Sequence, residues 1–252
     1  DFPVVTDTLV NFHVQVRSAG GLYRRLRRQI VFTLDDEPAF HPFPRKLALP
    51  LLEWGMNWCI YRNAHQYHLV HAAVVEKNGI ACLMPGTSGA GKSTLCAALV
   101  SRGWRLVSDE LAVLSPDGNK VLPIARPISL KKESVPLIQA FAPELVFGPQ
   151  FRETPKGLLA HVKPPGDSVY QMDEPAHPRR IVFPEWHEDA AAELEPVEKG
   201  QAFYRLADCS LNYHILGSDG FHGLTDFVDG CDCYQFRYST LDEAVDAFDS
   251  LV

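Results

Sequence analysis

Residues 86–94 read G-T-S-G-A-G-K-S-T, which is the most specific pattern in this chain. It satisfies every fixed position of the pattern G-x-x-x-x-G-K-[ST]. An apolar run of strand type, 80–84, precedes it, and a segment of helical composition, 93–100, follows it. A strand, a glycine-rich loop and a helix N-terminus in this order point several backbone N–H groups at one spot, where they can hold a chain of phosphates. The stretch therefore predicts a P-loop; the competing interpretation is a glycine-rich turn without a ligand.

The P-loop pattern gives an expected role to each of its residues. The ammonium group of Lys92 is expected at the β- and γ-phosphates of a nucleotide, and the hydroxyl of Ser93 on Mg²⁺. The expected cofactors are therefore ATP and Mg²⁺. The residues predicted to bind the nucleotide are Gly86, Thr87, Ser88, Gly89, Ala90, Gly91, Lys92, Ser93 and Thr94.

The bulk composition is that of an ordinary soluble protein. With 252 residues, of which 46% are hydrophobic and 22% charged, the chain can form one large core or two modest ones. A net charge of −7 argues against a nucleic-acid partner held by phosphate contacts. The longest apolar stretch, 47–61, is too short to cross a bilayer and contains Glu53. No signal peptide is recognisable at the start, so we expect no membrane partner.

The six cysteines are scattered rather than spaced as a disulfide framework. This usage favours a reducing compartment and hence a cytoplasmic location. Cys231 and Cys233 resemble half of a metal site, but no second pair follows at zinc spacing. We interpret them as strand or turn cysteines.

The chain divides near residue 66. The region 1–66 predicts two strands, 12–17 and 29–34, and a helix over 47–61, packed on the core. The region 67–252 is the predicted catalytic domain. It opens with an apolar run, 68–75, and an Asn-Gly turn at 78–79. Later signals are strands at 105–107, 181–183 and 234–238, long loops around short elements over 143–178, and a final helix with a capping box at Thr240 and Glu243.

Two acids follow a short apolar strand after the P-loop helix. Residues 106–110 read L-V-S-D-E, which places Asp109 and Glu110 at the strand end. Phosphoryl transfer needs a carboxylate to help hold Mg²⁺ and often a second one to accept a hydroxyl proton. Adjacent residues of a strand point to opposite faces, but a turn at the strand end can direct both at the loop. A Walker-B-like pair is the preferred interpretation, and a surface turn is the alternative.

Residues 71–93 and the stretch R-G-W-R-L-V-S-D-E at 102–110 together resemble the catalytic domain of the bacterial HPr kinase/phosphorylases. The resemblance implies an α/β fold with a P-loop-containing mixed-sheet core, shared with phosphoenolpyruvate carboxykinase. Residues 1–66 do not resemble the N-terminal domain of the full-length enzymes. The closer likeness is therefore to HPr-kinase-related proteins, some of which phosphorylate serine in other proteins or in peptide precursors.

The resemblance also implies roles for individual residues. Asp109 matches the catalytic aspartate, which takes the proton from a serine hydroxyl, and Glu110 matches a second acid, which with Ser93 acts at Mg²⁺. His71 matches a histidine that orients the catalytic aspartate, although a lone strand histidine is more often structural. Arg179 or Arg180, in a basic segment that resembles a family loop, is expected to stabilise charge on the transferring phosphoryl group.

The chain also departs from this family. The glutamate-containing signature L-E-x-R-G-x-G-I-x-N-V is missing, and residues 122–132 stand in its place. Arg126 is a candidate for the arginine of that signature, but its metal-binding glutamate has no counterpart. A second polar cluster contains Lys156 and His161, where Lys156 either contacts substrate phosphate or is a solvated loop lysine. These losses predict transfer in the forward direction only.

Three functions remain open from the sequence. The leading one is a kinase that transfers phosphate from ATP, with Mg²⁺, to a serine or threonine hydroxyl of a small protein or peptide. The second is a small-metabolite kinase of the same fold, since the same loop and base serve any alcohol. The third is a nucleotide-binding regulator with little turnover. The resemblance also implies a possible homo-oligomer.

Overall fold

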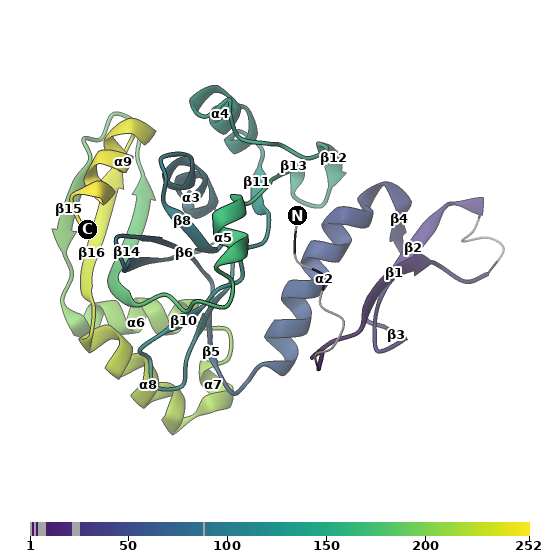
Figure 1. The fold of residues 1–252 in the computed structure, drawn as a ribbon, viewed down its shortest axis with the longest axis horizontal. Helices are drawn as coiled ribbons and strands as arrows, with labels where there is room; N and C mark the ends of the chain where they lie inside the picture. The colour runs from purple at the N-terminus through teal and green to yellow at the C-terminus, as the bar shows by residue number, and fades with distance from the viewer. Residues whose placement is uncertain (1, 3, 5–8, 22–25, 88) are drawn as a thin grey trace. The chain divides into compact units, whose positions relative to one another are not determined.

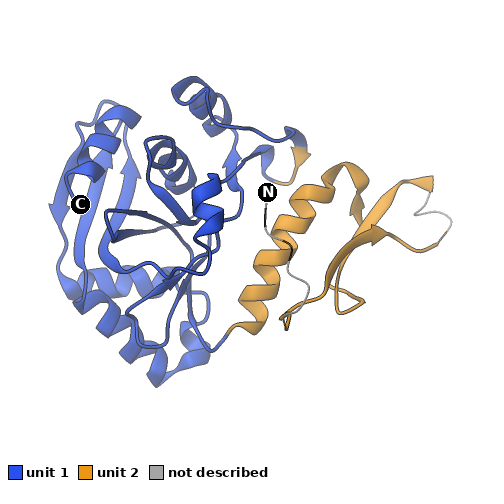
Figure 2. Cartoon of the chain, in the orientation of Figure 1, with its two compact units in different colours: residues 1–2, 65–152, 156–252 blue, residues 3–64, 153–155 orange. Residues whose placement is uncertain are grey.

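The computed structural model describes residues 2, 4, 9–21, 26–87 and 89–252. The chain folds into two compact units (Figure 2). The first unit contains His65–Arg152 and Lys156–Val252, and the second contains Pro3–Ala64 and Glu153–Pro155. The assignment of a catalytic domain to residues 67–252 stays a prediction.

A six-stranded mixed sheet forms the centre of the first unit (Figure 1). Four of its strands, β16, β14, β7 and β8, run in one direction, and β6 and β15 run against them. The fold is therefore α/β with a mixed sheet, as the sequence predicted. In spatial order the strands are β15 (Glu193–Pro196), β16 (Asp232–Tyr238), β14 (Pro178–Trp186), β7 (Ile80–Pro85), β6 (Ala72–Lys77) and β8 (Arg105–Ser108).

Both faces of this sheet are buried. Successive side chains of a strand point to opposite faces of the sheet, and in these strands the side chains on both faces are largely apolar. Along β6, Ala73 and Val75 belong to one core cluster, whereas Ala72 and Val74 belong to the other. The first cluster includes the helices α3 (Lys92–Ser101) and α9 (Leu241–Asp249). The second includes α6 (Lys199–Cys209) and α8 (Ser218–Asp229), which lie together on the other face (Figure 1).

Two small sheets and three short helices complete the first unit. One sheet has the order β10-β9-β5 and the other the order β11-β13-β12. The ranges are β5 (His68–Val70), β9 (Ala112–Leu114), β10 (Val121–Leu122), β11 (Ile128–Lys131), β12 (Phe151–Thr154), β13 (Gly157–Val162), α4 (Ser134–Phe141), α5 (Gly166–Tyr170) and α7 (Tyr213–Leu216).

The second unit is a small antiparallel sheet covered by one helix. The strands β1 (Val14–Ser18) and β2 (Gln29–Leu34) form its ladder, and β3 (Glu37–Pro38) and β4 (Phe43–Pro44) both pair with β2. The turn η1 (Arg45–Leu47) leads into α2 (Ala48–Asn63). Gly55 lets α2 approach the sheet, because a Cβ there would lie 2.2 Å from a ring carbon of Phe32. The two strands and the helix predicted for this region are thus confirmed, with ends shifted by one or two residues.

Three local expectations were wrong or incomplete. The apolar run 68–75 is not one strand: it breaks at His71 into β5 and β6, which belong to different sheets. Thr240 precedes α9 in an extended conformation, but its side chain makes no capping hydrogen bond, so the predicted capping box does not form. The helices α6 and α8 were not anticipated.

Among the described residues, no helix combines the length and apolar character that a membrane crossing requires.

Candidate functional site

The sheet topology brings three separate stretches of sequence to one edge. Strands β7 and β8 both run antiparallel to β6, so their carboxyl ends lie at the edge where β6 begins. At this edge Ala72 pairs with Pro85, and Val74 pairs with Ser108. His71 before β6, the P-loop after β7 and Asp109 after β8 therefore converge, although they lie up to 38 residues apart in the chain.

The P-loop has the backbone that its glycines predict. Gly89 and Gly91 have φ angles of 97° and 85°, in the left-handed region where a side chain is strained. Gly91 directly precedes α3, and a Cβ on it would lie 3.0 Å from the hydroxyl of Tyr238. The backbone conformation thus favours glycine at both positions, and the limited space does so at Gly91.

The first residue of the loop, Gly86, lies close to Ala90 near the end of the loop. A Cβ on Gly86 would lie 3.3 Å from the Cβ of Ala90, and the Ala90 N–H donates to the Thr87 carbonyl at 3.3 Å. Thr94, in the first turn of α3, donates its hydroxyl to Ser134 at 2.7 Å and so joins α3 to α4. Ser88, the remaining predicted nucleotide-binding residue, lies outside the described residues.

Lys92 is held inside the loop. The residue is only 6% exposed, and its ammonium group donates to the carbonyls of Gly86 at 2.6 Å and Thr87 at 2.8 Å. Burial lowers the pKa of Lys92, and the nearby Asp109 opposes this shift. A phosphate chain in the loop would give this buried charge an anionic partner, which is the role predicted for it.

His71 joins the P-loop lysine to the acidic turn. Its Nδ1 lies 2.9 Å from the Glu110 carbonyl and its Nε2 3.3 Å from the Lys92 ammonium. A carbonyl only accepts and an ammonium only donates, so Nδ1 carries the proton and Nε2 accepts. Burial and the Lys92 charge lower the pKa of His71, which fits this neutral form. The ring therefore contacts the backbone of Glu110 rather than the predicted carboxylate of Asp109.

Asp109 lies between the P-loop helix and the strand β11. It is 9% exposed, and its Oδ1 accepts from the Ser93 hydroxyl at 2.9 Å while its Oδ2 accepts from the Ser129 N–H at 3.0 Å. Burial and the neighbouring Glu110 raise the pKa of Asp109 to about 6. A carboxylate with this pKa is ionised at neutral pH but more basic than an exposed one, which suits a general base.

Glu110 turns away from Asp109. Its φ of 74° places it in the left-handed region, which is strained for a residue with a side chain. The carboxylate pairs with the ammonium of Lys131 at 2.6 Å. Burial alone would raise the pKa of Glu110, but Lys131, Lys156 and His71 together lower it. The two acids thus have pKa values shifted in opposite directions, a pattern typical of functional sites.

The donor set at this edge fits Mg²⁺. The Ser93 hydroxyl and the Asp109 carboxylate lie in contact, and hard oxygen ligands of this kind hold Mg²⁺ beside substrate phosphates. Glu110, the acid predicted at the metal with Ser93, is instead paired with Lys131. Over the described ranges, no group of three His, Cys, Asp or Glu side chains is arranged to hold a metal ion by itself, and this includes Cys231 and Cys233.

Arg179 and Arg180 lie at the opposite end of the sheet. Arg180 pairs with Cys82 near the start of β7, roughly 13 Å of strand before Gly86. Its guanidinium donates to Asp232 at 2.7 Å and to the Leu251 carbonyl at 3.2 Å. Arg179 is exposed at the same edge. The structure therefore does not bring the two predicted arginines to the P-loop of their own chain.

The strands β11 and β13 contribute site residues that the sequence did not single out. Ser129 and Lys131, both on β11, hold the two acids through the contacts described above. No local pattern marks them, because they contact acids that lie 20 and 21 positions earlier in the chain. His161, which the sequence had already marked together with Lys156, lies opposite Ser129 on β13, and burial together with the charges of Lys131 and Arg126 lowers its pKa.

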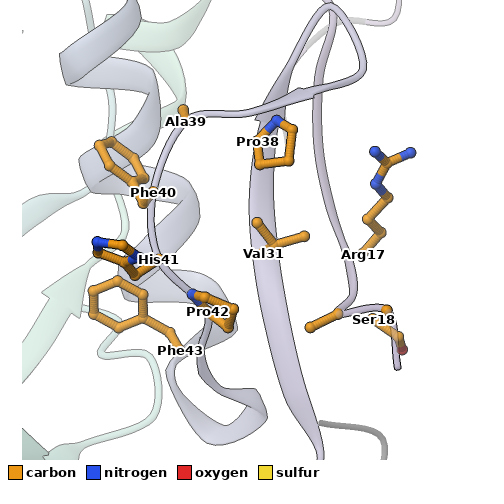
Figure 3. Close-up of a pocket in the computed structure, with 11 residues that line it drawn as sticks. Arg17, Ser18, Val31, Pro38, Ala39, Phe40, His41, Pro42 and Phe43 are labelled. Atoms are coloured by element: carbon orange, nitrogen blue, oxygen red, sulfur yellow. The ribbon is translucent and has the colours of Figure 1, made fainter. Parts of the chain in front are cut away.

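The second unit contains a cavity of its own, of about 1000 Å³ (Figure 3). Phe40, Pro42 and Phe43 line one side, and Val31 and Arg17 contribute from the strands. None of the residues predicted for nucleotide binding or catalysis lines it.

Comparison with known proteins gives partial matches. The chain is 40% identical over 57 residues to the HPr kinase/phosphorylase of Prosthecochloris aestuarii (strain DSM 271 / SK 413), covering 23% of this chain and 17% of that protein. It is 41% identical over 54 residues to the HPr kinase/phosphorylase of Treponema pallidum (strain Nichols), covering 21% and 17%. The match thus spans about a sixth of these relatives. No family model matches the chain.

Among solved structures, the Hpr(Ser) kinase/phosphatase from Coxiella burnetii matches 73% of this chain and 96% of that chain, with a TM-score of 0.30 and 14% identity. A likeness this low carries no functional argument. The sequence identity to the curated relatives does confirm the resemblance predicted from the P-loop and the acidic turn: over the matched stretch, this chain is similar to HPr kinase/phosphorylases.

Proposed function

We propose that this chain is a kinase that transfers the γ-phosphate of ATP, with Mg²⁺, to a serine or threonine hydroxyl of a protein or peptide. One observation carries the proposal: the hydrogen bond of 2.9 Å between Ser93 of the P-loop and Asp109 of the acidic turn. It connects Ser93, which is suited to hold the nucleotide's metal, with the buried carboxylate of Asp109, which is suited to accept a proton.

The chain's own residues divide the work of the transfer. The loop N–H groups and Lys92 bind and orient the phosphates, and the Ser93 hydroxyl supplies an oxygen ligand for Mg²⁺. Mg²⁺ bound there would neutralise charge on the phosphates during transfer. Asp109 then has to lie within hydrogen-bond reach of the acceptor hydroxyl, whose proton it takes as the oxygen attacks the γ-phosphorus.

The neutral His71 keeps this arrangement in place. By accepting from Lys92 and donating to the Glu110 carbonyl, it ties the P-loop to the turn that carries Asp109. In this proposal His71 is a positioning residue. Arg179 and Arg180 take no part in the transfer within one chain, because they lie at the other end of the sheet.

The preference for a protein or peptide acceptor comes from the relatives, which are named HPr kinase/phosphorylase. It is tested by incubating the protein with γ-labelled ATP, Mg²⁺ and a lysate of its source, with Lys92→Ala as the inactive control. Label on phosphoserine or phosphothreonine of a polypeptide is the expected result. Label on a small molecule would assign a metabolite kinase, and no Lys92-dependent label would assign a nucleotide-binding regulator.

A further inference from the structure

We propose that Trp186 stacks on the base of the nucleotide whose phosphates the P-loop holds. The inference deepens the proposed function and rests on it. It names the ligand class of the loop: a nucleoside triphosphate that is bound through both its phosphates and its base, rather than an inorganic polyphosphate.

The order of the strands gives the bound nucleotide a direction. In the central sheet, β7 with the P-loop lies between β14 and β6, and β8 with the acidic turn lies beyond β6. The proposed transfer requires the γ-phosphate beside Asp109, at the end of β8, where Ser93 also lies. The nucleoside then extends to the opposite side of the P-loop, along the carboxyl ends of β14 and β16, which is the edge where open α/β sheets bind their ligands.

The strand β14 reaches past the P-loop strand at this edge. Ile181 of β14 pairs with Leu83 of β7. From this pair, β7 ends two residues later at Pro85, whereas β14 ends five residues later at Trp186. The strand β14 therefore continues for three more residues, or roughly 10 Å, beyond the start of the P-loop. Trp186 thus lies beside the space in front of the loop rather than within the sheet.

Trp186 also lies on the face of the sheet where the P-loop helix begins. Val182 of β14 belongs to the core cluster that includes α3, and side chains four residues apart on a strand share a face. The register partner of Trp186 on β16 is Tyr238. The Tyr238 hydroxyl lies 3.0 Å from the position of a Cβ on Gly91, the residue before α3. Tyr238 therefore links the position of Trp186 to the start of the helix.

The indole ring of Trp186 is exposed and held in place. The residue is 55% exposed, and its Nε1–H donates to the Ser239 carbonyl at 3.0 Å. The loop after β14 is tied to the same strand end, because the His187 N–H donates to the Tyr238 carbonyl at 3.0 Å and the Ser239 hydroxyl donates to the Ala190 carbonyl at 2.7 Å. With its N–H already bonded, the ring has its π-face left for a ligand, and nucleobases stack on such faces.

The test compares two probes, a non-hydrolysable ATP analogue and inorganic tripolyphosphate, each with Mg²⁺, by calorimetric titration. Both have a chain of three phosphates, but only the analogue has a base. We expect Trp186→Ala to bind the analogue about 10-fold or more weakly than the parent and to bind tripolyphosphate equally well. Trp186→Phe keeps an aromatic face and should retain most of the affinity. The control Tyr170→Ala, which removes an exposed ring on α5, should change neither affinity.

The outcomes distinguish a failure of this inference from a failure of the proposed function. Unchanged affinity of Trp186→Ala for the ATP analogue, or an equal loss for tripolyphosphate, would overturn the stacking inference and leave the P-loop assignment standing. Binding of neither probe by the parent would overturn the proposed function, and this inference with it.

Tryptophan fluorescence gives a second measurement that does not depend on the Ala variant. The ATP analogue, but not tripolyphosphate, should quench the fluorescence of the parent, because only the base reaches the ring. This quenching should be lost in Trp186→Phe, although that variant still binds the analogue. Equal quenching of the parent and Trp186→Phe would show that another of the four tryptophans responds, and would contradict the inference.

Discussion

The Ser93 hydroxyl lies 2.9 Å from Asp109 Oδ1 and donates to it. This contact joins the first turn of α3, the helix that follows β7, to the end of β8, and β6 lies between β7 and β8 in the sheet. The Ser129 N–H holds the second carboxylate oxygen at 3.0 Å, so the side chain is fixed from two sides. A buried acid fixed in this way is preorganised, and its titration can be followed in both stability and activity.

The titration of Asp109 should lower the unfolding free energy of the protein as the pH rises. Its pKa is about 6 in the folded state against 3.8 in the unfolded chain, so between these values the folded protein binds more protons. The Asn variant lacks this titration. We expect the unfolding free energy of Asp109→Asn, relative to the parent, to rise by about 2 kcal/mol between pH 4 and pH 6.5. Urea denaturation of both proteins measures this difference. A constant difference would show that the carboxylate is not shifted.

Lys92→Ala should weaken nucleotide binding. The variant loses the buried ammonium that is held at the Gly86 and Thr87 carbonyls and is expected at the phosphates. The expected loss is about 2 kcal/mol or more, or roughly 30-fold in Kd, as for hydrogen bonds to charged groups. Calorimetric titration with Mg²⁺-ATP measures it, with the exposed Lys120→Ala as the control. An unchanged affinity in Lys92→Ala would contradict the P-loop assignment.

Gly91 and Tyr238 should be energetically coupled. Alanine at Gly91 meets a left-handed backbone, at about 1–2 kcal/mol, and its Cβ also lies 3.0 Å from the Tyr238 hydroxyl. Tyr238→Phe removes that oxygen, so the double variant should be more stable than the sum of the single losses by at least about 0.5 kcal/mol. Gly89→Ala has the same backbone strain but no atom within 4 Å, so it should be additive with Tyr238→Phe. Thermal unfolding of the single and double variants measures both couplings, and equal additivity at the two glycines would contradict the close contact.

The local parts of the site could be predicted from the sequence, and the long-range parts could not. The P-loop and the Asn-Gly hairpin are specified by neighbouring residues, and Asn78 and Gly79 indeed have φ of 54° and 77°. Lys131 reaches Glu110 across 21 positions of the chain, a contact that has no local signal. The positions of Arg179 and Arg180 likewise depend on the register of β14 against β7.

The missed helices have a physical explanation as well. The interior glycines of α8, Gly220 and Gly223, lower its helix propensity and concealed it in the sequence. Gly223 is needed there because a Cβ would lie 2.1 Å from the ring of His68. For α6, the buried pair Ala202 and Leu206 has helical spacing, so its signal was present in the sequence.

The reaction should run in one direction. Phosphorolysis of a phosphoserine requires inorganic phosphate to be bound as the incoming nucleophile, and the glutamate signature that the family has is absent here. Arg179 and Arg180 lie at the other end of the sheet and do not compensate within one chain. With the phosphorylated acceptor, Mg²⁺ and millimolar phosphate, we expect no pyrophosphate above background. Release of pyrophosphate at a rate comparable to the forward reaction would show that the enzyme is bifunctional.

The sharpest test of the proposed kinase is phosphate transfer from γ-labelled ATP by the parent protein and by Asp109→Asn, measured from pH 5 to pH 8 with ATP binding measured in parallel. The parent rate should fall toward low pH, where Asp109 takes up its proton. The Asn variant should bind ATP normally but transfer phosphate about 100-fold or more slowly, since it cannot accept the hydroxyl proton. Transfer by Asp109→Asn at the parent rate, or no transfer by the parent to any acceptor, would contradict the proposed function.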